Sequence, residues 1–228
     1  MYDVLSKLKV GKAPGIDGIP AGLLLLCASG ISSSLAAMFN VSFDTDTFRA
    51  DWKKAVVIPV HKKGARDMPG NYRPIALPPI VSKVMERLVP NKLSRFRTPW
   101  FAPNQSGFKK KDGTIPQLLR HTRAWSVAVN SGCYVGSVFF DLRKAFDRVW
   151  HGGLLSKLKA AGVAGAAFQW LTNFLSNRVQ ATAVDSPVSL FSSLHDGVPQ
   201  GAILSPLLFS VYMNIPFAES TNLFADDT

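Results

Sequence analysis

The feature that most constrains the fold is a pair of short apolar runs that lead into carboxylates. Residues 137–141 form one run, which ends at Asp141, and residues 221–224 enter a turn that carries Asp226 and Asp227. Short apolar runs suit buried strands, and neighbouring antiparallel strands bring their ends side by side. Asp141 and Asp226 can therefore converge in space, at the ends of neighbouring antiparallel strands.

The rest of the chain alternates helical and extended patterns. Apolar residues at helical spacing predict helices, and β-rich or alternating stretches predict strands. Expected helices cover residues 21–40, which should be mostly buried, 81–97 with an interruption near Pro90, 153–161, 168–175 and 202–214, and expected strands cover 55–60, 71–75 and 178–184. Pro59 cannot donate to a ladder, which predicts for 55–60 either an edge strand or a strand that ends at this proline. The first two strands should form a hairpin with a cationic tip.

The net charge of +11 is distributed unevenly along the chain. Residues 53–123 contain 16 Lys and Arg against three acidic residues, a net charge of +13, so the remainder has a net charge of −2. A solvated basic face accounts for such a segment as well as a polyanionic partner does. The second interpretation predicts phosphate binding without sequence preference, because neutralised phosphates release counterions.

Composition argues against several classes of protein. The hydrophobic share of 47% predicts a globular chain, yet no apolar run approaches the roughly 18 residues of a membrane span. The residues after Met1 lack the basic and apolar regions of a secretory signal, so we expect a protein that is neither secreted nor bound to a membrane. Cys27 and Cys133 lie far apart with no CxxC or nearby His, which predicts two buried thiols and no disulfide or zinc site.

Carboxylates that converge in space repel one another unless a cation compensates their charge. Mg²⁺ prefers such hard oxygen ligands together with phosphate oxygens. Two ions held close together activate an attacking hydroxyl and stabilise a leaving phosphate group. Taken alone, however, an Asp-Asp pair in a turn is more often a solvated or capping motif. A catalytic role for these carboxylates can therefore be inferred only together with the motifs around them.

Several motifs occur in one fixed order along the chain. They are residues 11–20 (GKAPGIDGIP), 52–64 (WKKAVVIPVHKKG), 71–77 (NYRPIAL), 105–108 (QSGF) with Thr114, 138–147 (VFFDLRKAFD), 197–206 (GVPQGAILSP) and 224–227 (FADD). The ordered set resembles the reverse transcriptase of non-LTR retrotransposons, in particular jockey-like LINE elements. The blocks resemble, in turn, a leader motif peculiar to these enzymes, two fingers motifs, a template-side block and the catalytic palm motifs. The resemblance covers essentially all 228 residues.

The resemblance implies a role for each of ten residues. Asp141, Asp226 and Asp227 match the catalytic carboxylates that ligate two Mg²⁺ ions, or Mn²⁺, with Asp227 ligating less directly. Phe146 matches the aromatic gate that excludes a ribose 2′-hydroxyl, although in isolation it would be interpreted as a core residue. Arg73 matches the cation that grips the triphosphate, with help from Lys63 or Lys62, which by themselves would suit a surface turn. Gln200 matches the residue that supports the nucleotide and template base, between Gly197 and Gly201, which allow close backbone approach.

The implied fold is an α+β right-hand polymerase whose antiparallel palm sheet places Asp141 beside Asp226. Its fingers cover about residues 1–130 and an incomplete palm covers about 131–228, the thumb being absent. The implied partners are an RNA template, a DNA primer, deoxynucleoside triphosphates and the remainder of a retrotransposon polyprotein with its endonuclease and thumb, but no membrane. Synthesis is then expected in the cytoplasm and reverse transcription in the nucleus. Because the chain ends one residue after Asp227, we expect little or no polymerase activity from these 228 residues alone.

Two alternatives stay open at this point. A group II intron-type or telomerase-type polymerase shares the same carboxylate chemistry, although the leader motif and residues 197–206 favour a LINE element. A catalytically inactive relic, which at most binds RNA through its basic segment, is the alternative from another class. Intact catalytic motifs argue against long decay, whereas the point at which the chain ends argues for it.

Overall fold

The computed structural model describes residues 1–93, 105–109, 112–185 and 188–214, and its fold is mixed α+β. The four strands are β1 (Lys54–His61), β2 (Tyr72–Leu77), β3 (Arg178–Thr182) and β4 (Ser192–Leu194), and they form one sheet in the order β2-β1-β3-β4. The β1–β2 and β3–β4 pairs are antiparallel, and β1 and β3 are parallel. The described sheet is therefore mixed, and it does not include the residues of the antiparallel pair predicted at 137–141 and 221–224.

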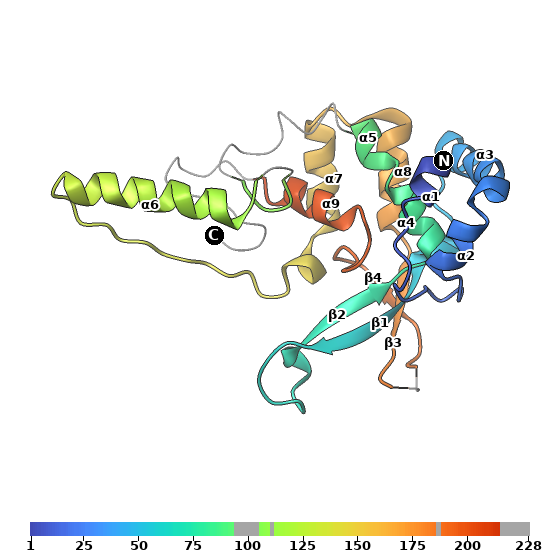
Figure 1. Cartoon of the computed structure of the whole chain (residues 1–228), viewed down its shortest axis with the longest axis horizontal. Coiled ribbons are helices and arrows are strands. Elements are labelled where there is room, and N and C mark those ends of the chain that lie inside the picture. The colour runs from blue at the N-terminus through green and yellow to red at the C-terminus, as the bar shows by residue number, and fades with distance from the viewer. Residues whose placement is uncertain (94–104, 110–111, 186–187, 215–228) are drawn as a thin grey trace.

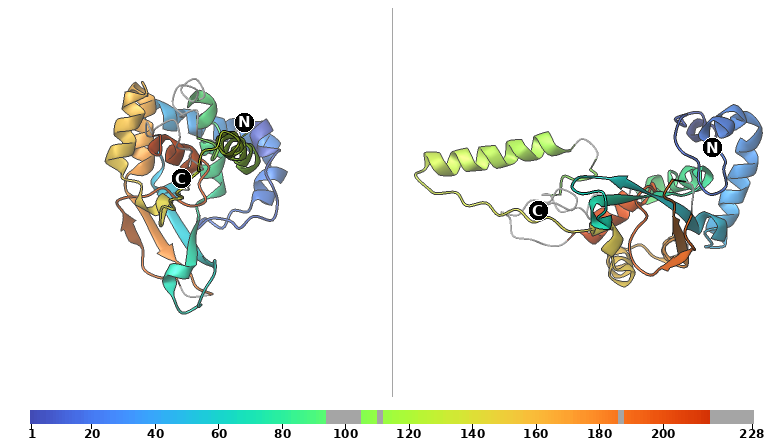
Figure 2. Two further views of the ribbon diagram at one scale, coloured as in Figure 1. Left: turned by 90° about the vertical axis from the view of Figure 1, so that its left-hand side faces the viewer. Right: turned by 90° about the horizontal axis from the view of Figure 1, so that it is seen from below.

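Most of the helices gather on one side of the molecule, above the sheet in Figure 1. They are α1 (Tyr2–Leu5), α2 (Ala21–Leu26), α3 (Ala28–Asp44), α4 (Ile80–Glu86), α5 (Val89–Leu93), α7 (His151–Ala160), α8 (Gly165–Leu175) and α9 (Ser205–Tyr212). The exception is α6 (Thr114–Asn130), which projects away from this body in Figure 1 and in the right-hand view of Figure 2. Among the described helices, none is long and apolar enough to cross a membrane.

The expected helices are largely confirmed, with shifted ends. The helix predicted over 21–40 is broken at Cys27 into α2 and α3, and it is less buried than expected, since Leu26 is 83% exposed. The interruption expected near Pro90 is present: α4 ends at Glu86 and α5 begins at Val89, so that Pro90 occupies a first turn, where a missing N–H costs little. Residues 94–97 of that prediction lie outside the described residues.

The prediction of an edge position for β1 is wrong, because β1 lies between β2 and β3. Its pairing with β3 runs only from Lys54 to Val57, however, and ends before Pro59. Pro59 itself faces Pro74 of β2 in the outer part of the hairpin, where β1 has a single neighbour. Proline is confined to strand positions that need not pair on both sides, and Pro59 occupies such a position. The rule therefore holds for the outer part of β1, although it does not predict the central place of the strand in the sheet.

The strand predicted at 137–141 is absent from the described structure. Residues 133–140 have no regular secondary structure, and Asp141 forms only a single-residue bridge. The apolar side chains Val138, Phe139 and Phe140 are 73%, 75% and 62% exposed. A strand requires a neighbour to pair with, and the expected partner at 221–224 lies outside the described residues, as do Asp226 and Asp227. The predicted meeting of Asp141 and Asp226 stays a prediction.

Both cysteines are exposed, which corrects the prediction of buried thiols. Cys27 lies at the break between α2 and α3, and Cys133 follows the turn that ends α6. Neither position faces the core, because both belong to connections at the ends of helices and not to their buried faces.

An aromatic cluster in the main core joins α3, α8 and the chain that enters β1. Phe48 lies at its centre, with ring centroids 5.6 Å from Trp52, 5.4 Å from Trp170 and 5.0 Å from Phe174. Its indole neighbour Trp170 donates from Nε1 to Ser42 Oγ at 3.2 Å, so the polar edge of that ring is satisfied inside the core. The cluster fixes the start of β1 against the helices.

We predict that Phe48→Ala lowers the free energy of unfolding by about 3 to 5 kcal/mol, because the side chain is 1% exposed and its removal leaves a cavity between rings. Leu26→Ala is the control and should cost less than about 0.5 kcal/mol, since Leu26 is on the surface. Urea denaturation of the three proteins measures both values. Equal costs for the two changes would contradict this account of the core.

Candidate functional site

The loop that precedes α9 is the point where distant parts of the chain meet. Residues 197–204 belong to the block expected to contact nucleotide and template, and backbone hydrogen bonds join this loop to β2 and to residues 146–149. Ala76 N in β2 donates to Gln200 O at 2.7 Å, Val198 N donates to Phe146 O at 2.8 Å, and Gly197 N donates to Val149 O at 2.8 Å. The loop is therefore a fixed part of the fold.

The two glycines of the loop are required by this close approach. Gly197 has φ +88°, and a Cβ on it would lie 2.9 Å from the carbonyl oxygen of Asp147. Gly201 has φ +136°, and a Cβ there would collide with the carbonyl oxygen of Ala76. Both backbones occupy conformations that residues with side chains rarely adopt. These glycines permit close approach of the loop to the neighbouring protein backbone, whereas their contact with nucleic acid stays a prediction.

A fully buried carboxylate holds the other end of the loop. Glu86, at the end of α4, is 0% exposed. Its Oε2 accepts hydrogen bonds from Ile203 N at 2.6 Å and Leu204 N at 3.0 Å, and its Oε1 accepts from Ser82 Oγ at 2.9 Å. These amides belong to the start of α9, where free N–H groups need partners. Sequence reasoning counted Glu86 only as one acidic residue in a basic segment; the available signal was a serine four residues before it, on the same helix face.

Glu86 shares the interior with one buried cation. Arg178, at the start of β3, donates from Nη1 to Phe174 O at 2.9 Å, and its guanidinium lies 4.9 Å from the centroid of the Phe174 ring. Burial lowers the pKa of Arg178 to about 10, and the charge of Glu86 opposes this shift, so the side chain remains charged at pH 7. Burial raises the pKa of Glu86, while its hydrogen bonds from Leu204 and Ser82 and the charge of Arg178 act in the other direction.

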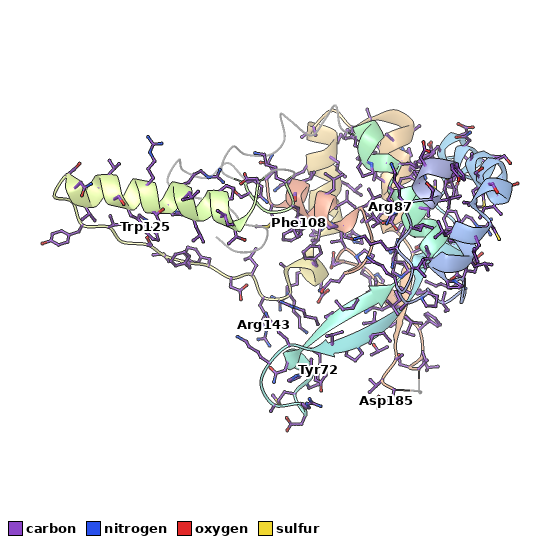
Figure 3. All side chains as sticks on the ribbon, viewed as in Figure 1. Tyr72, Arg87, Phe108, Trp125, Arg143 and Asp185 are labelled. Atoms are coloured by element: carbon purple, nitrogen blue, oxygen red, sulfur yellow. The ribbon has the colours of Figure 1, made fainter. Side chains whose placement is uncertain are left out.

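The segment after Asp141 carries the expected aromatic gate. Phe146 lies in a 3₁₀ turn (Ala145–Arg148) and is half-buried. Its ring stacks on Phe209 of α9, with centroids 4.6 Å apart and planes 12° from parallel, and meets Phe108 edge-on at 5.9 Å. Figure 3 shows Phe108 beside α9, at the inner end of α6. The ring is thus held in one orientation, as a gate would need, although its role toward a sugar stays a prediction.

The expected phosphate-binding cations surround the tip of the β1–β2 hairpin. Lys62, Lys63 and Arg73 are all exposed, which confirms that this tip is cationic. The loop between the strands is tied to itself by His61 Nε2 to Gly64 O at 3.0 Å and by Tyr72 Oη to Arg66 O at 2.7 Å. Lys53, by contrast, is buried, and burial followed by the charge of Arg178 lowers its pKa. This lysine is therefore not available to a polyanion.

One further cation reaches this hairpin from the segment that follows Asp141. Nη2 of Arg143 lies 3.7 Å from the position that a Cβ atom on Gly70 would take. Figure 3 shows Arg143 close to the hairpin tip near Tyr72. The structure thus joins the hairpin to the Asp141 segment at its tip and, through Ala76, to the Gln200 loop at its base. Arg73 and Ala76 are three residues apart in one strand, roughly 10 Å along it.

The metal site itself cannot be assembled from the described residues, which contain no group of three or more His, Cys, Asp and Glu able to hold an ion. Two of the three expected ligands, Asp226 and Asp227, lie outside that part of the chain. Asp141 is exposed, and within the described residues no hydrogen bond or ion pair occupies its carboxylate. Its oxygens are therefore free to serve as ligands.

We predict that Glu86→Ala lowers the free energy of unfolding by about 2 to 5 kcal/mol, because it leaves two backbone amides without partners. Glu86→Gln mimics the protonated acid: its oxygen can accept from both backbone amides, and its nitrogen can donate to Ser82 Oγ in place of the bond that Ser82 now donates. The raised pKa means that the folded state retains the Glu86 proton above its ordinary value of 4.5, so ionisation costs stability as pH rises from 4.5 toward the folded pKa. Below 4.5 the wild type should match Glu86→Gln, and above it the wild type should become the less stable of the two.

Urea titrations of wild type and both variants across pH 4 to 8 measure these differences. If the free energy of unfolding of the wild type instead increases relative to that of Glu86→Gln as pH rises, the carboxylate is stabilised in its charged form, contrary to this prediction.

Comparison with known proteins places the chain in a family. The family model for "Reverse transcriptase (RNA-dependent DNA polymerase)" matches residues 60–228. From Drosophila melanogaster, the RNA-directed DNA polymerase from mobile element jockey is 35% identical over 92% of this chain, and the probable RNA-directed DNA polymerases from transposon BS and transposon X-element are each 34% identical, over 93% and 92%. The chain spans about a quarter of the length of these curated relatives, with 23% to 24% covered. The chain belongs to the reverse transcriptase family, and its relatives are RNA-directed DNA polymerases of non-LTR retrotransposons.

Proposed function

We propose that this chain forms the nucleotide-binding part of a polymerase that copies the RNA of a non-LTR retrotransposon into DNA. The observation that carries the proposal is the pair of backbone hydrogen bonds that join the Gln200 loop to β2 through Ala76 and to the Phe146 segment through Val198. They bring residues from three expected polymerase motifs to one place. Family membership and the printed names of the relatives support the same activity.

The proposed reaction is nucleotidyl transfer. The oxygen of a primer 3′-hydroxyl attacks the α-phosphorus of a deoxynucleoside triphosphate; a P–O bond forms to the primer, the bond to the bridging oxygen breaks, pyrophosphate leaves and the hydroxyl proton is released. Asp141, Asp226 and Asp227 would hold two Mg²⁺ ions, or Mn²⁺, which favour the ionised hydroxyl and neutralise charge on the leaving group. Asp141 fits this task because its exposed carboxylate has no other partner in the described part of the chain.

The remaining residues bind and select the nucleotide. Arg73, with Lys62 and Lys63, meets the triphosphate from the hairpin, since a guanidinium suits phosphate oxygens. Phe146 excludes a ribose 2′-hydroxyl, and its packing against Phe108 and Phe209 keeps the ring from moving aside. In the same proposal Gln200, Gly197 and Gly201 face the template base and nucleotide. The proposed fingers, up to about residue 130, supply β1 and β2 of the described sheet, and the proposed palm supplies β3 and β4. We propose that copying takes place in the nucleus.

Activity should be measured on a longer protein that contains these residues, because the relatives are about four times as long. We predict Mg²⁺-dependent addition of deoxynucleotides on an RNA template, lost at least 1,000-fold in Asp141→Asn because a metal ligand loses its charge. Phe146→Ala should instead retain deoxynucleotide addition and gain ribonucleotide addition. Primer-extension gels with each nucleotide type measure both. A protein that folds and binds RNA but extends no primer would favour the inactive relic.

Nucleic-acid binding should depend on the hairpin and on salt. We predict that Lys63→Ala and Arg73→Ala each weaken RNA binding by the 228-residue chain and reduce the slope of log K against log salt by about one, because each removes one phosphate contact. Lys159→Ala, an exposed lysine of α7 outside the basic segment, is the matched control and should change neither value. Filter binding between 50 and 200 mM salt tests this. If neither Lys63→Ala nor Arg73→Ala changes the slope, the hairpin does not belong to the RNA-binding interface.

A further inference from the structure

A side-chain hydrogen bond links the Phe146 segment to the Gln200 loop. Gln200 Nε2 donates to Asp147 Oδ1 at 3.0 Å, across 53 residues of sequence. Both residues are half-buried, and both backbones are anchored: Asp147 N donates to Lys144 O at 3.0 Å, and Gln200 O accepts from Ala76 N. No other hydrogen bond or ion pair reaches either side chain within the described residues. Each of these two side chains thus has the other as its hydrogen-bond partner, between backbones that other hydrogen bonds already hold together.

The chemistry of the two groups determines which way the amide points. An ionised carboxylate only accepts hydrogen bonds, whereas a carboxamide has a donating nitrogen and an accepting oxygen at its two ends. The nitrogen of Gln200 must therefore face Asp147, and Oε1 must point away from it. Without the carboxylate, the amide could turn over at little cost, because its two ends have nearly the same shape.

We propose that Asp147 is a positioning residue that fixes the Gln200 amide with its carbonyl oxygen toward the bound substrate. This inference rests on the proposed function, because it assumes that Gln200 faces the nucleotide. An outward carbonyl accepts hydrogen bonds and cannot bind a phosphate oxygen. The group it meets is a donor, such as a sugar hydroxyl or a base N–H, while the phosphates are left to the hairpin cations.

The neighbouring contacts leave Asp147 free for this task. The imidazole of His151 pairs through Nε2 with Gly197 O at 2.7 Å, so that histidine fixes the backbone of the loop and not the glutamine side chain. Since a carbonyl only accepts, Nε2 is the donor. Glu86 likewise binds only the backbone of Ile203 and Leu204 in this loop. Changing Asp147 therefore alters the amide without releasing the loop.

The first test needs no polymerase activity. Glutamine-selective ¹⁵N labelling of the 228-residue chain reports the Gln200 side-chain amide, which is identified by its loss in Gln200→Glu. In Asp147→Ala and Asp147→Asn we expect the two amide protons to move toward the positions of a free glutamine and to exchange faster with water. Asp196→Asn, an exposed carboxylate next to Gly197 that makes no such bond, is the matched control and should leave the signals in place. Signals unchanged in Asp147→Ala would overturn the proposal.

The second test separates orientation from stability. In a longer, active protein, Asp147→Asn should raise the KM for deoxynucleotides about tenfold, with kcat within about threefold and an unchanged melting temperature, because one directed hydrogen bond to the nucleotide is lost. A fall in melting temperature with kcat and KM reduced together would show a merely structural role and overturn the proposal. If no variant or wild-type protein extends a primer, the proposed function fails, and the amide spectrum still decides whether Asp147 orients Gln200.

Discussion

The carboxylate of Glu86 holds together the parts on which the rest of the structure depends. It lies at the end of α4 and accepts from two successive amides at the start of α9, 117 residues away in sequence, and its 0% exposure keeps this contact out of reach of solvent. A buried charge is costly unless its hydrogen bonds are complete, and those of Glu86 involve both of its oxygens. This fixes the Gln200 loop, which in turn fixes β2 and the Phe146 segment. Loss of the Glu86 hydrogen bonds would therefore displace the Gln200 loop, β2 and the Phe146 segment together.

Local patterns in the sequence predicted most of the helices and the β1–β2 hairpin, because periodicity and turn residues act over a few residues. They could not predict that β1 and β3 pair in parallel, since that contact joins residues more than a hundred positions apart, and its partners carry no complementary signature. The long helix α6 was not predicted. Its apolar residues are exposed on several faces, with Leu118, Leu119 and Val127 54%, 64% and 60% exposed, and so form no clear buried stripe. At residues 137–141 the opposite occurred: a strand was predicted from an apolar run, but the described structure has no regular secondary structure over residues 137–140.

The candidate site shows a similar division. The residues expected to contact a substrate directly, such as Phe146, Gln200 and Arg73, were predicted from motifs. In the structure a backbone hydrogen bond joins Phe146 to the loop that contains Gln200. The residues that hold them, Glu86, Asp147 and His151, were not singled out. Their partners lie 117, 53 and 46 residues away, and a lone acid or imidazole has no spacing pattern to reveal it. The positions of Asp226 and Asp227 relative to Asp141 remain a prediction, since both lie outside the described residues.

The fold also separates two uses of charge. Arg178, Glu86 and Lys53 lie inside, where their surroundings shift their pKa values and their partners are backbone groups, rings and one another. The hairpin cations lie outside, with their charges open to water and to phosphates. The base of the hairpin is fixed by Ala76 to the Gln200 loop, whereas its tip is held by hydrogen bonds within its own loop and is approached by the Arg143 side chain. A strand that is anchored at one end and self-tied at the other can tilt about its base without breaking the core. In the proposed function, such a movement would adjust Arg73 to a triphosphate while the Gln200 amide and the Phe146 ring keep their places.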